Sequence, residues 1–307
     1  MVVAWEKFRK GKRSRPDVMV FERNLEDNLF ALRDDLLAGR YRHGAYHRFV
    51  VFDPKQRTIH KANVRDRVVH QALVNVIEPS FERQFIHDSY SCRIGKGTHA
   101  AVRRLRLFLR QASRNGRKTV YAVKCDVRKF FDSVEHGILI GLLRRRIHDR
   151  RLMDLLREII GSFSTRPGKG IPLGNLTSQL FANVYLHELD WFVKHGLRVH
   201  HCLRYCDDFV MLASSKERAF QLAEQADAFL GEHLKLRLHP NKIIVRTWKQ
   251  GIDFLGYVLL PQATILRTKT KKRMLRLGKQ ENLTSYLGAC AHADAFELTR
   301  AILMSAS

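Results

Sequence analysis

Acidic residues are scarce in this sequence of 307 residues, where 30 Asp and Glu stand against 55 Lys and Arg. The net charge is +25 and the isoelectric point lies near 10.3. Each phosphate that a basic protein neutralises releases condensed counterions, so this excess predicts a polyanionic partner, with nucleic acid as the leading candidate. A protein that is merely basic and soluble is the alternative that the composition leaves open.

Cysteine is also rare. The five cysteines are an odd number and are scattered: Cys92, Cys125, Cys202, Cys206 and Cys290. This excludes a disulfide framework and predicts reduced, mostly buried thiols. The single C-x3-C pair has no second Cys pair or His-x3-His after it, which argues against zinc.

Long apolar runs are missing as well, so no membrane span is expected, and the N-terminal MVVAWEKFRKGKR lacks the order of a signal peptide. A cytoplasmic location follows as the expectation. The phosphate-loop pattern GxxxxGK[ST] is absent, because Lys96 is followed by Gly97, and this excludes nucleotide hydrolysis at such a loop. An apolar content of 45% still supports a sizeable core, and the length predicts about two domains.

Two adjacent carboxylates, Asp207 and Asp208, stand in the middle of HCLRYCDDFVMLA. Apolar runs on both sides predict two buried strands joined by a tight turn with the acids at its tip. Buried neighbouring carboxylates repel each other, and a divalent cation is the natural way to neutralise them. An Asp-Asp pair is also a common turn former whose side chains bond local backbone N–H groups, so the pair alone does not decide the matter.

A third carboxylate favours the metal. The run TVYAVKCDV predicts a core strand with Asp126 at its carboxyl end, where an isolated charge is costly. Antiparallel pairing can bring Asp126 beside the Asp207 turn. Carboxylate oxygens are hard ligands, which favour Mg²⁺ or Mn²⁺ over zinc.

The remaining pattern alternates helices and strands. Apolar periodicity predicts helices at 21–37, ending before Gly39, at 64–77, closed by Pro79, and at 215–234. A basic helix is expected after Gly97 and a long apolar one after Gly174. A hairpin is expected within 41–62, with its turn at Asp53-Pro54, and GIDFLGYVLL reads as a strand pair.

Seven blocks in order carry a resemblance to a known family. They are VRDRVVHQAL, SYSCRIGKGTHAAV, VKCDVRKFFDSVEH, GIPLGNLTSQLFANVYL, RYCDDFVMLA, LHPNKI and GIDFLGY. From about Tyr41 to Leu260 the chain resembles a reverse transcriptase, close to the group II intron-like bacterial type. The resemblance implies an α+β fold with the right-hand polymerase architecture of fingers, a palm with an antiparallel sheet, and a short helical thumb. It also implies an RNA-directed DNA polymerase that works by two-metal phosphoryl transfer.

On this resemblance the expected divisions are a basic N-terminal extension with a helix at 1–39, fingers at 40–118, the palm at 119–149 and 171–260, a fingers/palm connection at 150–170, and a short basic thumb at 261–307.

The resemblance also implies roles for single residues. Asp126, Asp207 and Asp208 match the catalytic carboxylates that bind Mg²⁺, or Mn²⁺ in its place, and the backbone of Val127 is a further metal ligand. Phe131 matches the bulky gate that excludes a ribose 2′-OH. Nucleotide contacts are expected from Lys55, Arg57, Arg128, Lys129, Phe130, Phe131, Leu173 and Gly174. Nucleic-acid contacts are expected from Arg93, Lys96, Tyr205, Lys271, Lys272 and Arg273.

Two blocks depart from the common family pattern. The YxDD turn has Cys206 where methionine, alanine or valine is usual, and LGNLTSQ has Leu173-Gly174 and Ser178-Gln179 where most members have QGxxxSP. The second variant resembles the reverse transcriptases of diversity-generating retroelements, which copy a template RNA with errors at adenines. The resemblance to reverse transcriptases as a whole implies deoxynucleoside triphosphates, template RNA and RNA/DNA hybrid as ligands. The likeness to the diversity-generating type, together with the short thumb, implies an oligomeric accessory RNA-binding protein as partner.

Two other interpretations remain open. An antiviral-defence or unclassified bacterial reverse transcriptase would share every catalytic block. A catalytically silent RNA-binding protein with the same fold is the alternative from another class of function.

Overall fold

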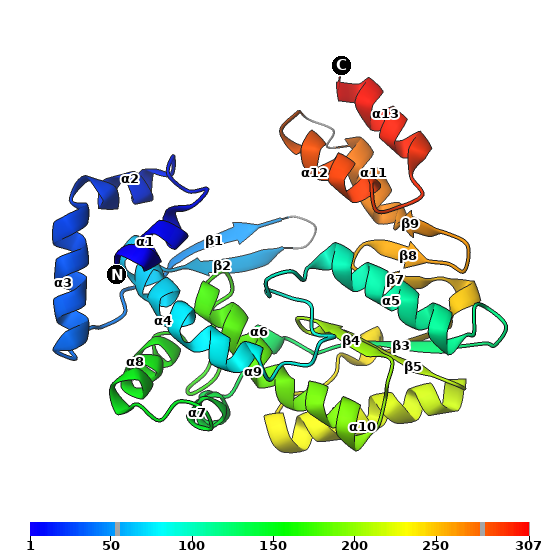
Figure 1. Ribbon diagram of the computed structural model, residues 1–307, viewed down its shortest axis with the longest axis horizontal. Coiled ribbons are helices and arrows are strands. Elements are labelled where there is room, and N and C mark those ends of the chain that lie inside the picture. The colour runs from blue at the N-terminus through cyan, green and yellow to red at the C-terminus, as the bar shows by residue number, and fades with distance from the viewer. Residues whose placement is uncertain (53–55, 277–279, 307) are drawn as a thin grey trace. The chain divides into compact units, whose positions relative to one another are not determined.

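The computed structural model describes residues 1–52, 56–276 and 280–306. The chain forms two compact units, each assembled from three stretches of sequence (Figure 1). The first unit comprises Met1–Ile86, Val127–Asp190 and Phe229–Arg237, and the second unit comprises His87–Asp126, Trp191–Ala228 and Leu238–Ser307. Helices and antiparallel sheets occur in both units, as the α+β prediction requires.

The first unit is mainly helical, with one two-stranded sheet. Its elements are α1 (Val2–Arg9), α2 (Pro16–Arg23), α3 (Leu25–Leu37), β1 (His47–Val51), β2 (Arg57–Lys61), α4 (Val64–Glu82), α6 (Phe130–Ser133), α7 (His136–Arg144), α8 (Arg150–Gly161) and α9 (Leu176–Trp191). The antiparallel pairing of β1 with β2 confirms the predicted hairpin, while its Asp53-Pro54 turn lies outside the described residues.

Two predicted helix limits in this unit are wrong. The helix expected at 21–37 is broken at Asn24, which has φ −118° and ψ 48°. Asparagine is a weak helix former, because its side chain competes for backbone hydrogen bonds. The second helix does not end before Pro79 but continues to Glu82. The buried side chains of Ile77 and Phe81, four residues apart on one face, outweigh the hydrogen bond that Pro79 cannot donate.

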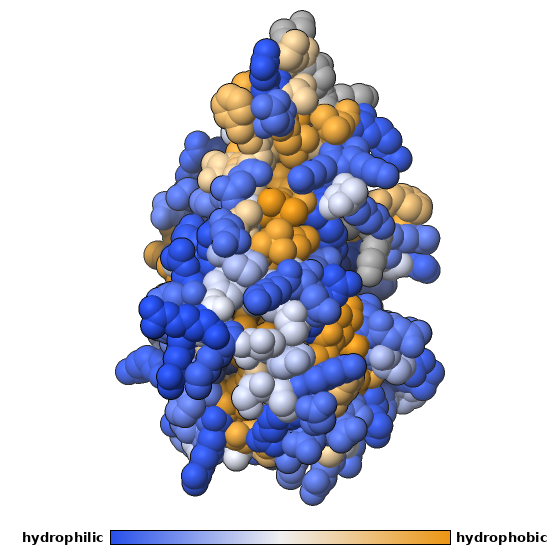
Figure 2. Space-filling view, turned by 90° about the vertical axis from the view of Figure 1, so that its right-hand side faces the viewer, coloured by the Kyte–Doolittle hydropathy of each residue, from blue (hydrophilic) through white to orange (hydrophobic). Residues whose placement is uncertain are grey.

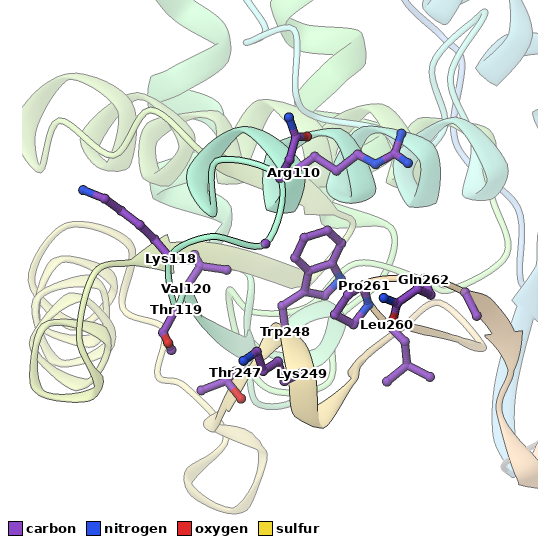
Figure 3. A pocket seen from close by; sticks show the side chains of 13 residues that line it. Arg110, Lys118, Thr119, Val120, Thr247, Trp248, Lys249, Leu260, Pro261 and Gln262 are labelled. Atoms are coloured by element: carbon purple, nitrogen blue, oxygen red, sulfur yellow. The ribbon is translucent and has the colours of Figure 1, made fainter.

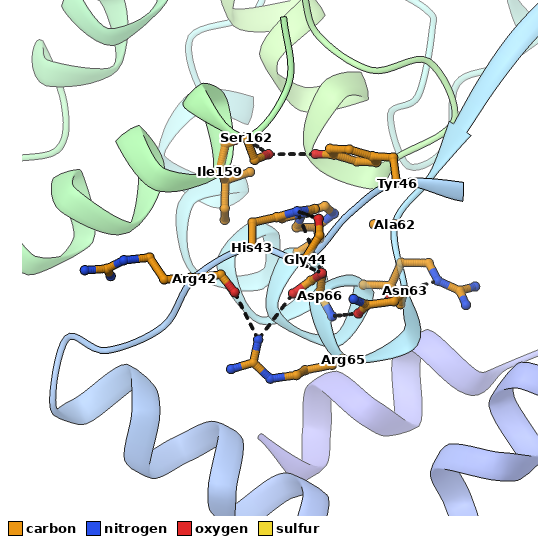
Figure 4. Close-up of polar contacts among 12 residues, drawn as sticks. Arg42, His43, Gly44, Tyr46, Ala62, Asn63, Arg65, Asp66, Ile159 and Ser162 are labelled. Carbon is orange, nitrogen blue, oxygen red and sulfur yellow. Dashed lines mark hydrogen bonds and ion pairs between the residues drawn. The ribbon is translucent and has the colours of Figure 1, made fainter. Parts of the chain in front are cut away.

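A buried carboxylate fastens the segment before β1 to α4 (Figure 4). Asp66 is fully buried and accepts hydrogen bonds from the Tyr41 hydroxyl at 2.8 Å and from the Gly44 backbone N–H at 2.9 Å. A Cβ at Gly44 would lie 2.5 Å from Nδ2 of Asn63, so only glycine fits at this point. The root of the β1–β2 hairpin is therefore held by polar contacts as well as by packing.

The second unit contains two antiparallel sheets. A four-stranded sheet has the order β4-β5-β3-β6, formed by β3 (Tyr121–Asp126), β4 (Cys202–Tyr205), β5 (Asp208–Ala213) and β6 (Ile244–Thr247). A three-stranded sheet consists of β7 (Ile252–Phe254), β8 (Tyr257–Leu259) and β9 (Thr264–Leu266), of which β7 and β8 are the predicted strand pair. The helices are α5 (Thr98–Ala112), α11 (Thr268–Arg276), α12 (Gln280–Cys290) and α13 (Phe296–Ala306), while α10 (Lys216–Leu234) begins in this unit and ends in the first.

Apolar side chains of α5 join the two sheets of the second unit in one core. Val102, Leu105 and Leu109 of α5 belong to the same buried cluster as Val210 of β5 and Phe254 of β7. Five of the six residues of β5 are buried, so both faces of this strand are covered. This confirms the prediction of a buried hairpin and explains why its turn is held firmly.

Among the described residues, no helix is long and apolar enough to cross a membrane. Hydrophilic side chains cover much of the face shown in Figure 2, and hydrophobic ones gather there in a narrower strip.

One buried hydroxyl of the first unit joins three of its chain segments and provides a test of the fold. Tyr185 of α9 is 0% exposed, donates a hydrogen bond to the carbonyl of Leu234 at 2.7 Å and accepts one from the N–H of Glu135 at 3.3 Å. We expect Tyr185→Phe to lower the free energy of unfolding by about 1–3 kcal/mol, because two buried backbone groups lose their partner. Urea denaturation measures this.

Tyr121→Phe is the matched control, because its hydroxyl makes no hydrogen bond with a described residue. It should change the free energy of unfolding by less than about 0.5 kcal/mol. Equal losses in the two variants would contradict the role of the Tyr185 hydroxyl.

Candidate active site

Three carboxylates meet at one end of the four-stranded sheet. Asp126, the last residue of β3, lies directly opposite Asp208, the first residue of β5, in the antiparallel register. Asp207 precedes Asp208 in the turn between β4 and β5, whose last paired residues are Tyr205 and Asp208. The predicted approach of Asp126 to the Asp-Asp turn therefore follows from strand pairing.

The turn itself needs an unusual backbone conformation. Cys206 has φ 56°, and two-residue hairpin turns require a positive φ at their first central residue because this matches the twist of the strands. For a residue with a side chain this conformation costs about 1–2 kcal/mol. It is held by the guanidinium of Arg204, which donates a hydrogen bond to the carbonyl of Cys206 at 3.0 Å.

Arg204 also ties the turn to residues 88–90, which lie near the start of the second unit. It is 1% exposed and donates to the hydroxyl of Ser89 at 3.0 Å. Its backbone N–H donates to the carbonyl of Asp88, and its own carbonyl accepts from the N–H of Tyr90. The sequence suggested only an interruption of an apolar run at Arg204, whereas the structure shows a buried cation that fixes the position of the carboxylates.

Burial and mutual repulsion dominate the electrostatics of the acids. Burial raises the pKa of Asp207, and the charges of Asp208 and Asp126 raise it further. Burial likewise raises the pKa of Asp208, although the ammonium group of Lys124 opposes that effect. Protons or cations at this edge of the sheet therefore relieve an unfavourable interaction.

Two lysines partly neutralise the acids, and sequence reasoning missed both. Nζ of Lys242 lies 2.5 Å from Oδ1 of Asp126, and Nζ of Lys124 lies 3.6 Å from Oδ1 of Asp208. Lys124 could have been found from the strand period of two, which places it on the same face as Asp126. Lys242 carries the weaker signal of being the only cation in LHPNKI.

The donor set fits a hard divalent cation. Three carboxylates supply oxygen ligands alone, and the raised pKa of Asp207 shows that positive charge is favoured there. In this structure Asp126 is paired with Lys242. With the side chains in these positions, the described residues contain no group of three or more His, Cys, Asp or Glu side chains close enough to hold a metal ion. Val127, the further predicted ligand, follows Asp126 directly and is buried.

The predicted nucleic-acid contacts of the second unit fall into two groups. Arg93 donates to the carbonyl of Ser89, Lys96 donates to the carbonyl of His87, and Tyr205 accepts from the hydroxyl of Thr98. These three therefore lie on or beside the segment that Arg204 fastens. In α11, Arg273 lines a cavity of about 1040 Å³ together with Lys96, whereas Lys271 and Lys272 do not line it.

The predicted nucleotide contacts of the first unit differ in how exposed they are. Lys55 lies outside the described residues. Arg57, Arg128 and Lys129 are exposed, and Lys129 has φ 46° just before α6. Phe130 is buried in the core at 1% exposure, whereas Phe131 is half-buried, so only the second ring reaches the surface.

The loop with the unusual sequence pairs with the hairpin. The carbonyl of Leu173 accepts a hydrogen bond from the N–H of His60 at 3.0 Å, and the Asn175 side chain donates to the carbonyl of His60 at 2.7 Å. Gly174 has φ +108°, and a Cβ there would lie 2.6 Å from Cγ2 of Ile59. The conformation and the close approach of Ile59 both require glycine.

Comparison with known proteins assigns the class. A telomerase from Candida tropicalis, solved with a fragment of telomeric RNA, shares the fold with a TM-score of 0.56 at 11% identity, over 90% of this chain and 56% of that one. The family model for reverse transcriptase (RNA-dependent DNA polymerase) matches residues 53–259. The chain belongs to the reverse transcriptase family, which confirms the predicted fold class and the prediction of an RNA-directed DNA polymerase.

Two curated relatives, one of them a group II intron-encoded protein, illustrate the similarity at the level of sequence. Protein YkfC of Escherichia coli (strain K12) is 28% identical over 284 residues, which cover 78% of this chain and 73% of the relative. The group II intron-encoded protein LtrA of Lactococcus lactis subsp. cremoris is 24% identical over 72% of this chain. The chain spans only 48% of the length of LtrA.

The carboxylates make stability depend on pH when no divalent cation is present. The pKa of Asp207 is higher in the folded state than the value of about 3.9 in the unfolded chain. Its stabilising contribution is therefore complete below that unfolded value and is lost as the pH rises through the folded pKa. We expect Asp207→Asn in EDTA to flatten this decline and to melt at a higher temperature than the wild type at pH 7.

Thermal melts from pH 4 to pH 8 with EDTA or Mg²⁺ measure this, and Mg²⁺ should raise the melting temperature of the wild type more than that of Asp207→Asn. Asp154→Asn, at a carboxylate whose side chain is 59% exposed, is the control and should keep the wild-type profile. A wild-type profile in Asp207→Asn would contradict the repulsion among the acids.

Proposed function

We propose that Asp126, Asp207 and Asp208 form the catalytic centre of this reverse transcriptase and that it copies an RNA template into cDNA. The observation that carries the proposal is the cross-strand pair of Asp126 and Asp208 beside Asp207, in a chain of this family. No structural need explains three acids at the end of a core sheet, where the charge of Asp126 adds to burial in raising the pKa of both Asp207 and Asp208.

The three carboxylates and the backbone of Val127 would hold Mg²⁺, or Mn²⁺ in its place. When bound, such ions lower the pKa of a primer 3′-OH and stabilise the charge that develops on a transferred phosphoryl group. Lys242 and Lys124 keep the acids partly neutral in the absence of metal and are positioned to contact an anionic substrate.

Residues of the first unit are assigned to the incoming nucleotide. Phe131 is only half-buried beside the core residue Phe130, which suits a ring that limits the space available to a ribose 2′-OH. The triphosphate is assigned to four basic residues on the basis of their family position and charge, namely Lys55, Arg57, Arg128 and Lys129.

We also propose the fingers, palm and thumb limits that the sequence predicted.

Tyr205 and five basic residues of the second unit are assigned to template RNA and RNA/DNA hybrid. Arg93, Lys96 and Tyr205 lie on or beside the segment that Arg204 fastens to the carboxylate turn. Lys271, Lys272 and Arg273 belong to α11, which has no acidic residue. An accessory RNA-binding protein is the proposed partner.

Primer extension on an RNA template tests the catalytic assignment. Asp126→Asn should reduce extension about a thousandfold or more, because the transition state loses a negatively charged ligand position. RNA affinity should stay within about twofold, because phosphate contacts come from basic side chains elsewhere.

Asp154→Asn is again the matched control and should extend primers at the wild-type rate. Near-normal extension by Asp126→Asn would reject the assignment. If the wild type binds RNA but incorporates no deoxynucleotide with Mg²⁺ or Mn²⁺, the RNA-binding alternative replaces it.

We further propose that the enzyme is of the diversity-generating type, with frequent errors opposite template adenine. The proposal rests on Leu173, whose backbone pairs with β2 while its side chain offers only apolar contact where most relatives place glutamine. An apolar contact discriminates weakly between nucleotides of similar shape. Loss of one polar constraint relaxes selection by about 1–3 kcal/mol, or roughly ten- to a hundredfold.

Sequencing of cDNA made on one RNA that contains all four bases tests this assignment. Leu173→Gln should lower the error frequency at adenines about tenfold or more. Leu37→Gln, at a leucine of α3 that is 65% exposed, should leave it unchanged. The diversity-generating assignment fails if wild-type errors at adenine are no commoner than at other bases, and the role of Leu173 fails if its variant shows wild-type errors.

A further inference from the structure

A second cavity lies at the opposite end of β3 from the carboxylates. It has a volume of about 750 Å³ and is lined by residues of the second unit alone (Figure 3). Val120, which lines it, is separated from Asp126 by about 20 Å of strand at about 3.3 Å per residue. The volume falls within the range of about 300–1,000 Å³ that is typical of ligand sites.

The charges around this cavity are all positive. Arg110, Lys118 and Lys249 line it, and no Asp or Glu does. None of these three forms a salt bridge with a described residue, in contrast to Arg104, which pairs with Asp88. Arg114 and Arg117, in the loop after α5, are exposed and add to the same positive region.

The floor of the cavity contains an unpaired donor. Trp248 is 4% exposed, and its indole N–H has no hydrogen-bond partner among the described residues. In Figure 3 the indole ring lies in the middle of the lining, between Val120 on one side and Pro261 on the other. A buried N–H without an acceptor is unfavourable, so an RNA oxygen that displaces the lining enough to reach this N–H gains a hydrogen bond.

The directions of the cationic side chains indicate the kind of anion. Figure 3 shows Arg110 and Lys118 extending from the rim in different directions, so they do not converge on one point. A single phosphate ion cannot contact both, whereas a chain of phosphates can. The amide side chain of Gln262 and the apolar surfaces of Leu260 and Pro261 lie on the same lining, which suits bases better than an acidic peptide.

We propose that this cavity and its basic rim bind the phosphodiester backbone of a single-stranded RNA segment, at a site separate from the catalytic carboxylates. The bound segment is not the nucleotide being copied, because about 20 Å of strand separates the cavity from the carboxylates. The site therefore acts as an RNA anchor. The proposal does not depend on the catalytic assignment, since binding requires neither metal nor nucleotide.

The test compares two variants of equal charge. One combines Arg110→Gln, Lys118→Gln and Lys249→Gln, and its control combines Arg146→Gln, Arg150→Gln and Arg151→Gln, three exposed arginines near α7 and α8 that form no salt bridge with a described residue. Affinity for a labelled single-stranded RNA is measured against KCl concentration without divalent cations. The logarithmic salt slope should fall by about 2 in the cavity variant, at about 0.7 per phosphate contact, and should stay at the wild-type value in the control.

Trp248→Phe keeps the apolar floor and removes the N–H, and it should weaken RNA binding about 2- to 10-fold. Circular dichroism melts establish that each variant is folded. Primer extension on a template too short to span both sites should proceed at the wild-type rate in the cavity variant, which separates failure of this site from failure of the catalytic one.

Three outcomes would overturn the proposal. Equal salt slopes in the cavity variant and the wild type would show that RNA does not contact the rim. A fall in slope as large in the control would show that only total charge matters. Loss of poly-glutamate binding by the cavity variant, with RNA binding intact, would assign the site to an acidic protein.

Discussion

Repulsion among like charges at the end of one sheet is the constraint on which the active site depends. The register of β3 against β5 sets Asp126 opposite Asp208, and partial burial at the end of the hairpin limits the water that screens their charges. The two lysines beside the acids and the buried guanidinium of Arg204 have different tasks. The lysines offset charge, whereas Arg204 fixes the backbone of the turn through the carbonyl of Cys206.

Stability and reactivity therefore oppose each other at this edge. A sheet that carried apolar residues at these three positions would lose the repulsion and gain packing, as buried charges generally cost more than apolar groups of similar size. On the proposed function, the acids are kept because they would hold a divalent cation. The positive φ of Cys206 is a similar case. A glycine there would remove the backbone strain and would also make the turn more flexible.

The sequence predicted those parts of the structure that depend on neighbours along the chain. Apolar residues on both faces of the run around Asp207 and Asp208 predicted the buried hairpin, and Asp126 at the end of a core strand predicted the third acid. Contacts between segments far apart in the chain could be predicted less well from the sequence. The bond between Lys242 and Asp126, the clamp of Arg204 on Ser89, and the burial of Asp66 under Tyr41 each join residues whose separation in sequence hides their contact.

Helix limits failed for a related reason. Rules that consider only neighbouring residues predicted a helix end before Pro79 and no break at Asn24. In the structure the helix continues past Pro79, because Ile77 and Phe81 are buried on one face. The roles proposed for Phe131 and Leu173 rest on the family resemblance, because the residues alone do not indicate them. The structure adds that the Leu173 loop is held to β2 by hydrogen bonds of Leu173 and Asn175 with the backbone of His60.

The two units are interleaved along the chain, and this limits how the protein can be divided. Six stretches alternate between the units, so the backbone passes from one to the other five times, once directly after Asp126. No single cut releases either unit whole, and neither can be completed on a ribosome before most of the chain has emerged. New domains can be joined without rearranging this connectivity at the chain ends or in exposed surface loops, whereas genetic exchange of one unit between relatives needs several simultaneous crossovers.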